Sequence, residues 1–342
     1  MNKIFIGIDF SKEKFDATLI KRDVKCEEAY DSFPNTEDGF KLFIKWVKSN
    51  SRGTTKQDWL FCGENTGLYS VKLSIYLAGK GYFMWLEHAL EIKYSMGVRR
   101  EKTDKADSRC IAMYAMRHED KARRFTPKST TMQALEILLS RRDLLVKMKG
   151  QLNSHATEMR AVYSRNPAAR YDYEKCMNDL ERYKKEIKET NKKILEEIER
   201  DEEVKENYQL ITSIKGIGPV NAIAFIIYTG NFTRFATAKQ LACYCGVVPF
   251  SKQSGTSVHS KPKISRFANK NLKTYLTEAA KAAVKHDKEL REYYQRMLGR
   301  GKDRYLVLNN VRNKLVRRIM AVIRDRTAFD DNYRNPYELK AS

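Results

Sequence analysis

The sequence predicts an α/β domain at the N-terminus, followed by two long helices and a mainly helical C-terminal domain. Three observations support this prediction. Strand-like apolar runs come first and then alternate with helical patterns. Apolar residues next recur every seven positions, and the last third of the chain has helical periodicity interrupted by turn residues. We expect the parts to cover 1–125, 126–208 and 209–330, with a tail over 331–342.

The α/β domain begins with three apolar runs that predict antiparallel strands, over 3–9, 15–20 and 28–33. A helix is predicted next, over 36–50, because its apolar residues share one face. The remaining elements alternate: we expect strands over 58–64 and 82–86, and helices over 68–78 and 104–117.

Four acidic residues stand at the ends of these elements. Asp9 ends the first strand, Glu64 ends a later one, and Asp104 and Asp107 lie one turn apart at a helix start. If the helix docks on the edge where those strands end, the four carboxylates converge. Hard divalent cations prefer oxygen ligands, and a pair of such ions supports phosphoryl transfer. Taken singly, each acid is explained equally well as a turn former, a surface residue or part of a solvated helix start capped by Thr103.

Apolar residues at seven-residue spacing predict two long helices between Met132 and Leu210. The positions are Leu138, Leu145, Leu152 and Met159, and then Leu180, Ile187 and Ile194. A helix-breaking segment over 164–168 separates the two runs. We expect either a helical hairpin or an arm that pairs with a second chain.

The net charge of +22 favours a polyanionic partner. Residues 251–342 carry 22 Lys or Arg and 9 Asp or Glu, so that more than half of the excess lies in the last quarter. Arg317 and Arg318 belong to a basic stripe on the predicted final helix, over 303–326. A solvated helix face is the usual reason for such a run, but charge this one-sided favours phosphate contacts.

The six cysteines form no CxxC pair, and the histidines complete no zinc spacing, so we expect reduced thiols and no zinc site. No apolar run approaches the roughly 20 residues of a membrane span. We therefore expect a cytosolic protein without membrane contact.

Two segments of the last third have their own chemistry. The turn Lys215-Gly216-Ile217-Gly218 precedes an apolar helix, whose N-terminal N–H groups suit a phosphate; a plain chain reversal is equally consistent. The stretch over 250–270 is polar and basic, which by composition predicts a flexible loop around phosphates. Its basic residues are Lys252, Lys261, Lys263, Arg266 and Lys270.

Three blocks together resemble the insertion-sequence 110 family of transposases, which includes the Piv DNA invertases. They are Gly7 to Lys12, Glu64 to Tyr69 and Lys102 to Asp107, and they resemble the DEDD blocks of that family in order. Phe10 and Ser108 differ from the family's usual residues, but neither change removes a ligand. The segments around Gly218, Gln240 and Gly246 are similar to the family's C-terminal domain, and 215–219 resembles a helix-hairpin-helix.

This resemblance implies an RNase H-type, RuvC-like N-terminal domain that binds Mg²⁺ or Mn²⁺ through Asp9, Glu64, Asp104 and Asp107. It implies that Ser254, followed by glycine, is the nucleophile of a transposase that cuts and rejoins DNA. It further implies a structured guide RNA, a dimer or tetramer, and action at the nucleoid of a prokaryotic cell.

Three other classes of protein are alternatives. A RuvC-like nuclease or junction resolvase needs only the four carboxylates and a water, and it leaves no covalent protein–DNA adduct. If the chain were an architectural DNA-binding protein, the four acids at the ends of the predicted elements would have no role. A sugar-kinase-like ATPase also begins with a GIDFSK-like strand, but the second glycine-rich phosphate loop that it needs is missing from the sequence.

Overall fold

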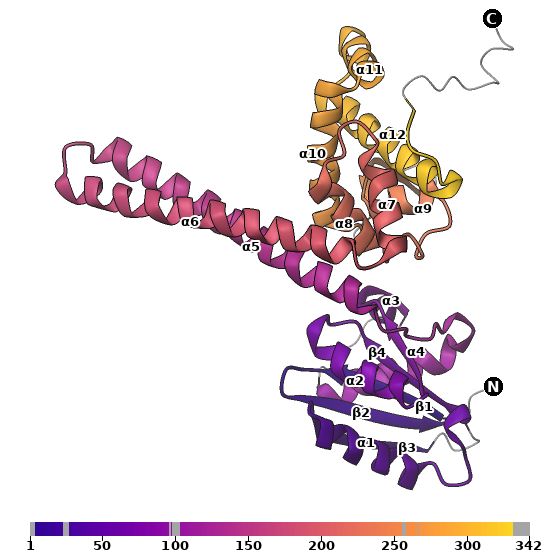
Figure 1. The fold of residues 1–342 in the computed structure, drawn as a ribbon. Helices are drawn as coiled ribbons and strands as arrows, with labels where there is room; N and C mark the ends of the chain where they lie inside the picture. Colours follow the sequence, from indigo (N-terminus) through magenta and orange to yellow (C-terminus); the bar gives the residue numbers. More distant parts are fainter. Residues whose placement is uncertain are drawn as a thin grey trace, which may run out of the picture. The chain divides into compact units, whose positions relative to one another are not determined.

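The computed structural model describes residues 4–22, 27–95, 97, 103–254, 258–265 and 267–330, with the backbone alone at 251–254 and 258–263. The chain divides into two compact units, Met1–Pro127 and Lys128–Ser342. The first is a mixed α/β unit and the second is almost entirely helical (Figure 1). This confirms the predicted fold class in broad terms.

A five-stranded sheet forms the centre of the first unit, in the order β3-β2-β1-β4-β5. The strands β1, β2 and β3 pair antiparallel, whereas β4 and β5 continue the sheet parallel to β1. This arrangement is consistent with the expected RuvC-like fold. The bounds are Ile4–Phe10 for β1, Lys14–Lys21 for β2, Glu28–Pro34 for β3, Trp59–Glu64 for β4 and Phe83–Glu87 for β5.

Helices cover both faces of this sheet because its strands alternate apolar residues inward on each side. Ile4, Ile6 and Ile8 pack with α1 (Glu37–Asn50) and α2 (Leu68–Gly79). Phe5 packs on the other face with α3 (Ala89–Ser95) and α4 (Asp104–Arg117). Helix α3 is absent from the sequence-based prediction, because seven residues are too few to show a clear period.

Gly7 sets how closely α4 approaches β1. A Cβ atom there would lie 2.2 Å from the backbone N of Ala112 and 2.2 Å from the backbone O of Ser108. Only a residue without a side chain permits this approach. The absence of a side chain in the middle of β1 therefore places the first turn of α4 next to the end of that strand.

We expect Gly7→Ala to lower the free energy of unfolding of the first unit by at least ~2 kcal/mol, since backbone atoms cannot move aside as a side chain can. All three tryptophans lie in this unit, so tryptophan fluorescence during urea unfolding reports on it alone. Gly79→Ala at the end of α2 is the matched control, because nothing lies within 4 Å of its added methyl group. Equal stability of the two variants would contradict the close-approach argument.

The second unit begins with α5 (Thr130–Val162) and α6 (Pro167–Ile198), which run antiparallel as a helical hairpin (Figure 1). Arg141 donates to Glu186, and His155 lies against Asp172 nearer the turn, so the contacts follow an antiparallel register. The predicted hairpin is therefore present within one chain. Whether it continues as a coiled coil with a second chain stays a prediction.

Two sequence-based expectations for the second unit are wrong in detail. The second long helix ends at Ile198, and the side chain of Asp201 accepts a hydrogen bond from the N–H of Val204 to begin α7 (Glu202–Thr212). The stretch expected to be a loop contains an antiparallel strand pair, β6 (Pro249–Ser254) and β7 (Val258–Ile264). Its high polar content hid the strand signal.

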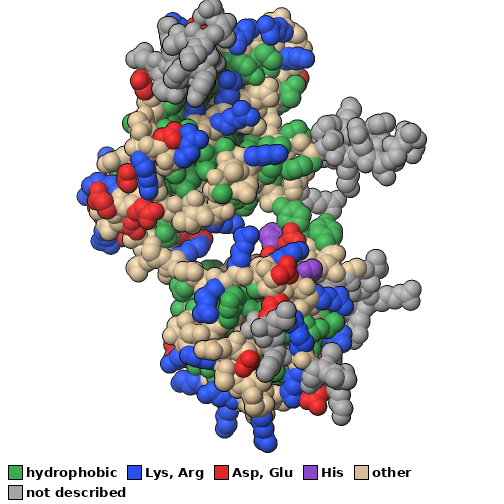
Figure 2. Space-filling view, turned by 90° about the vertical axis from the view of Figure 1, so that its right-hand side faces the viewer, with side chains coloured by type: hydrophobic (Ala, Val, Ile, Leu, Met, Phe, Trp, Pro, Cys, Tyr) green, Lys and Arg blue, Asp and Glu red, His purple; other side chains and the backbone are tan. Residues whose placement is uncertain are grey.

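Five more helices complete the second unit among the described residues, and the last of them agrees with the predicted final helix over 303–326 to within one residue at each end. They are α8 (Pro219–Thr229), α9 (Ala238–Tyr244), α10 (Lys270–His286), α11 (Lys288–Gly299) and α12 (Arg304–Asp325). Lys and Arg side chains are spread over both units on the face shown in Figure 2. Among the described residues, no helix is both long enough and apolar enough to span a bilayer.

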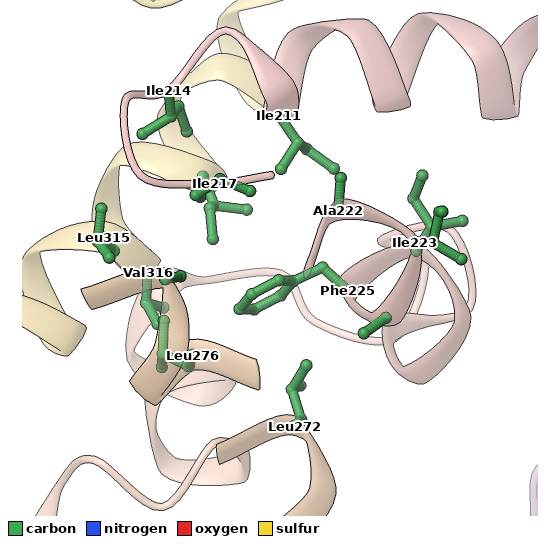
Figure 3. Close-up of a cluster of buried hydrophobic side chains, with 14 of the residues drawn as sticks. Ile211, Ile214, Ile217, Ala222, Ile223, Phe225, Leu272, Leu276, Leu315 and Val316 are labelled. Atoms are coloured by element: carbon green, nitrogen blue, oxygen red, sulfur yellow. The ribbon is translucent and has the colours of Figure 1, made fainter. Parts of the chain in front are cut away.

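The core of the second unit joins the foot of the hairpin to the C-terminal helices. Ile211, Ile214 and Ile217 converge with Phe225, and residues of α10 and α12 close the cluster (Figure 3). Ile194 and Ile198 of α6 also belong to this core. The turn predicted to bind phosphate is thus anchored by its own isoleucines.

Candidate active site

Asp9 and Glu64 lie on neighbouring strands at the same edge of the sheet. Ile8 pairs with Gly63, so the next residue on each strand is one of the two acids. Asp9 lies on the same face of the sheet as Phe5, because the two residues are an even number of positions apart on β1. For the same reason Glu64 shares a face with Leu60 and Cys62 on β4. Those apolar residues pack under α4. Both carboxylates therefore lie on the face of the sheet that α4 covers.

Asp104 and Asp107 occupy the first turn of α4 above that face. The Thr103 side chain accepts a hydrogen bond from the N–H of Ala106 and begins the helix. The buried hydroxyl of Ser108 lies 2.7 Å from the Thr18 hydroxyl on β2 and ties the helix to the sheet. Ser108, one of the two residues that differ from the usual pattern of the resembling family, thus has a hydrogen-bond partner on β2.

The pKa of Asp9 shows that the four acids share one electrostatic environment. Burial contributes most, followed by the negative charges of Asp107, Glu64, Asp104 and Asp16, and together they raise this pKa to about 6. Mutual repulsion favours some separation. Among the described residues, the four acids do not form a group whose ligand atoms all lie within 4.8 Å of one another. The group that meets this criterion lies in the second unit. The structure brings the four acids together as neighbours rather than as a closed cage.

Three further residues belong to this cluster and were not predicted from the sequence. Asp16 pairs with Asp9 across β1 and β2 and is buried. It accepts a hydrogen bond of 2.6 Å from the Tyr30 hydroxyl, which raises the pKa of Tyr30 to about 12. Lys14 Nζ lies 3.0 Å from Asp16 and 2.8 Å from Asp104. A basic side chain therefore bridges the sheet to the first turn of α4.

The signal for Asp16 is present in the sequence but depends on register. Ser11 N–H donates to the Lys14 carbonyl and closes a tight turn between β1 and β2. Such a turn places Asp16 directly opposite Asp9 on the same face. Predicting from the sequence that Asp16 lies opposite Asp9 would have required the length of this turn.

We expect the contribution of Asp9 to the free energy of unfolding of the first unit to fall by about 1 to 2 kcal/mol between pH 4 and 6, because one pKa unit corresponds to about 1.4 kcal/mol and solvent screens part of it. The folded pKa of Asp9 is above its ordinary value, so in this window the native state binds more protons than the unfolded state. Raising the pH then destabilises the fold.

The pH effect is measured by urea unfolding in a chelating buffer, with tryptophan fluorescence as the readout. Asp9→Asn removes the titrating group, so the difference between wild type and variant isolates its contribution from those of other acids. A difference that does not change with pH would contradict the raised pKa.

Ser254 is the last residue of β6 and pairs in register with Val258 of β7. Gly255, its neighbour in the expected serine motif, lies outside the described residues, as does Arg266. Lys252 lies on β6, and Lys261 and Lys263 lie on β7.

The Gly-Ile-Gly turn has a packing role that its sequence did not reveal. Gly216 has a φ of +96°, and a Cβ atom there would lie 2.5 Å from the Ala283 side chain of α10. Gly218 precedes Pro219 at the first position of α8. Lys215 is exposed, so it is the residue of this turn whose charge faces solvent.

The remaining predicted contacts to nucleic acid differ in their surroundings. Lys270 begins α10 and is exposed, and Arg317 is exposed on α12. Arg318 is 14% exposed and lies 2.6 Å from Asp287 and 2.5 Å from Glu289. The charge of Arg318 is therefore balanced inside the unit, whereas that of Arg317 faces outward.

Two family models match separate parts of the chain. A transposase model of the DEDD type matches residues 6–161, and the model of the IS116/IS110/IS902 family of transposases matches residues 208–295. The chain is thus an enzyme that acts on DNA by transposition or recombination. The segments that the two models match are similar to the corresponding parts of IS116/IS110/IS902 transposases.

Relatives support this assignment along most of the chain. The pilin gene-inverting protein of Moraxella bovis is 27% identical over 338 residues, which are 96% of this chain and 98% of that protein. The transposase for insertion sequence element IS1111A of Coxiella burnetii is 27% identical over 212 residues, 56% of this chain and 57% of that protein. An insertion element IS110 protein of Streptomyces coelicolor is 33% identical over 132 residues, 39% of this chain and 32% of that protein.

Proposed function

We propose that this transposase cuts and rejoins DNA through the hydroxyl of Ser254, assisted by divalent metal ions at Asp9, Glu64, Asp104 and Asp107. The observation that carries this proposal is the convergence of the four acids from β1, β4 and α4 on one face of the sheet. A unit that needed these acids only for stability would not leave Asp9 with a raised pKa, since burial and repulsion both oppose its charge.

The donor set fits Mg²⁺ or Mn²⁺, because it consists of carboxylate oxygens and lacks sulfur and imidazole ligands. When bound, such an ion polarises the scissile phosphate and lowers the pKa of an attacking hydroxyl. The carboxylates of Asp9 and Glu64 would hold the cation from the sheet, and those of Asp104 and Asp107 would hold it from α4. One of the helix acids can also accept the serine proton.

In the first chemical step, Ser254 Oγ forms a bond to phosphorus and the bond from phosphorus to one deoxyribose oxygen breaks. The serine proton passes to a carboxylate, and the departing oxygen takes up a proton from solvent and leaves as a hydroxyl end. In the second step, a hydroxyl end of another strand attacks the same phosphorus and releases the serine. The number of phosphoester bonds is conserved, so the exchange requires no ATP.

The partners that we propose are the DNA of the element and its target, together with a structured RNA guide. The basic excess of the chain matches polyanionic partners of either kind. We also propose assembly of two or four chains through the α5–α6 hairpin. Its distal end exposes Val162, Tyr163 and Tyr171, whose exposed fractions of 70%, 53% and 65% are high for large apolar side chains.

The test is to incubate the protein with end DNA of the element, the flanking transcript and Mg²⁺, and to search for a DNA adduct at Ser254 by denaturing electrophoresis and peptide mass spectrometry. An adduct supports the serine mechanism. Cleavage without an adduct would instead identify a RuvC-like nuclease or junction resolvase that uses water.

Lys14 gives a further prediction about the acidic cluster. Lys14→Met removes a cation that already occupies Asp104, so we expect the affinity for Mn²⁺ to rise about three- to tenfold. Free Mn²⁺ in a titration is measured by electron paramagnetic resonance. Lys12→Met is the matched control, because it removes an equal charge from the neighbouring turn; a weaker affinity of the Lys14 variant would show that Lys14 positions Asp104 for the metal instead.

A further inference from the structure

A second cluster of metal-ligating side chains lies in the α5–α6 hairpin of the second unit. His155 comes from α5, and Asp172 and Cys176 come from α6, where they are one turn apart. His155 Nε2 lies 3.0 Å from Asp172 Oδ2. One ligand atom from each of the three residues lies within 4.8 Å of the other two.

The three groups form a donor set that suits zinc. Zinc binds imidazole nitrogen, carboxylate oxygen and thiolate sulfur, and its tetrahedral bonds of about 2.0 to 2.3 Å place ligand atoms roughly 3.4 Å apart. The observed separations therefore need only small side-chain rotations. By contrast, the acidic cluster offers oxygen atoms alone and suits hard cations.

The burial of the three residues differs in a way that fits such a site. The Cys176 side chain is buried at the helix interface, whereas those of His155 and Asp172 are 50% and 42% exposed. The sulfur thus anchors the inner side, and the solvent side leaves room for a water as fourth ligand.

We propose that His155, Asp172 and Cys176 bind one transition-metal ion of the Zn²⁺ class, which clamps α5 to α6. Binding forms one bond from the metal to each of the nitrogen, oxygen and sulfur atoms, and it releases the thiol proton to solvent. Because the ligands come from both helices, the ion fixes their register close to the turn of the hairpin. The ordinary alternative is a half-exposed His–Asp ion pair beside a buried cysteine.

The probe is Co²⁺, whose bond to a thiolate produces a charge-transfer absorption in the near ultraviolet. The full chain, kept reduced with a phosphine, is titrated with Co²⁺ in the presence of excess Mg²⁺. We expect the absorption to saturate at one equivalent per chain and to disappear when Zn²⁺ is added. Excess Mg²⁺ does not compete for sulfur, which separates this site from the acidic cluster.

Variants assign the absorption to the three residues. Cys176→Ser removes the thiolate band, and His155→Ala weakens Co²⁺ binding at least about tenfold, since even indirect changes at metal sites cost 10- to 100-fold. Cys243→Ser is the matched control, because Cys243 is the least buried of the described cysteines. We expect this control to bind Co²⁺ as wild type does.

A thermal unfolding measurement completes the test. We expect Zn²⁺ to raise the melting temperature of the wild type and of Cys243→Ser but not that of His155→Ala. The His155 side chain is half exposed, so this variant should fold and can be used even if Cys176→Ser does not fold. A missing thiolate band, or a band lost in Cys243→Ser and kept in Cys176→Ser, would overturn the proposal.

Discussion

Replacing Ser254 by alanine is expected to abolish strand joining, with a loss of at least ~10³-fold in rate, because the substitution removes the hydroxyl that we propose as the nucleophile. The affinity for DNA should stay within about twofold, since no charge is lost and the overall fold is preserved. Joining is measured with labelled end DNA and its transcript, and affinity by fluorescence anisotropy.

Ser251→Ala is the matched control for this experiment. Ser251 lies on the same strand, β6, but lacks the glycine that follows Ser254 in sequence. We expect this variant to join DNA at the rate of the wild type. If the Ser254 variant still recombined DNA, the covalent part of the mechanism would be wrong while the metal site could still act with water.

Asp107→Asn is expected to lower the rate of joining by at least ~10²-fold while leaving nucleic-acid binding in place. The amide keeps the size of the carboxylate but removes the negative charge that a divalent cation requires. Repulsion of Asp9 is relieved at the same time, so the first unit should become slightly more stable in a chelating buffer. Urea unfolding and the joining assay together measure both effects.

The control for Asp107 is Asp38→Asn, because Asp38 is an exposed acid on α1 that forms an ion pair with Lys41, three residues further along the same helix. This variant should keep full activity. Loss of activity in both variants would point to a general effect of charge, and normal activity in the Asp107 variant would remove this residue from the metal site.

Mixing the two inactive variants distinguishes how the units cooperate. If Ser254 works with the acidic cluster of another chain, an equimolar mixture of Asp107→Asn and Ser254→Ala recovers part of the joining activity. If both act within one chain, the mixture stays inactive. The experiment also tests assembly through the α5–α6 hairpin, since recovery requires at least two chains in one complex.

Much of the fold was predictable because its signals are local. The alternation of apolar residues along β1 and β2, and the single apolar face of α1, lie within a few consecutive residues. The break between α6 and α7 was missed because the capping residue Asp201 stands in a charged stretch that resembles continuous helix. The β6–β7 hairpin was missed because its strands are polar.

The sequence by itself determined the basic character of the chain, the resemblance to DEDD transposases, and the position of Asp9, Glu64, Asp104 and Asp107 at element ends. These features depend on residue type and on short spacings, which the sequence states directly.

Only the tertiary structure decided which side chains from distant elements meet. The close approach at Gly7 places α4 on β1, and strand register puts Asp16 opposite Asp9. Helix packing brings His155 to Asp172 and Cys176, although no sequence spacing suggested a metal site there. Such contacts depend on register and on the fit of whole surfaces, to which many residues contribute small energies, so no local pattern encodes them.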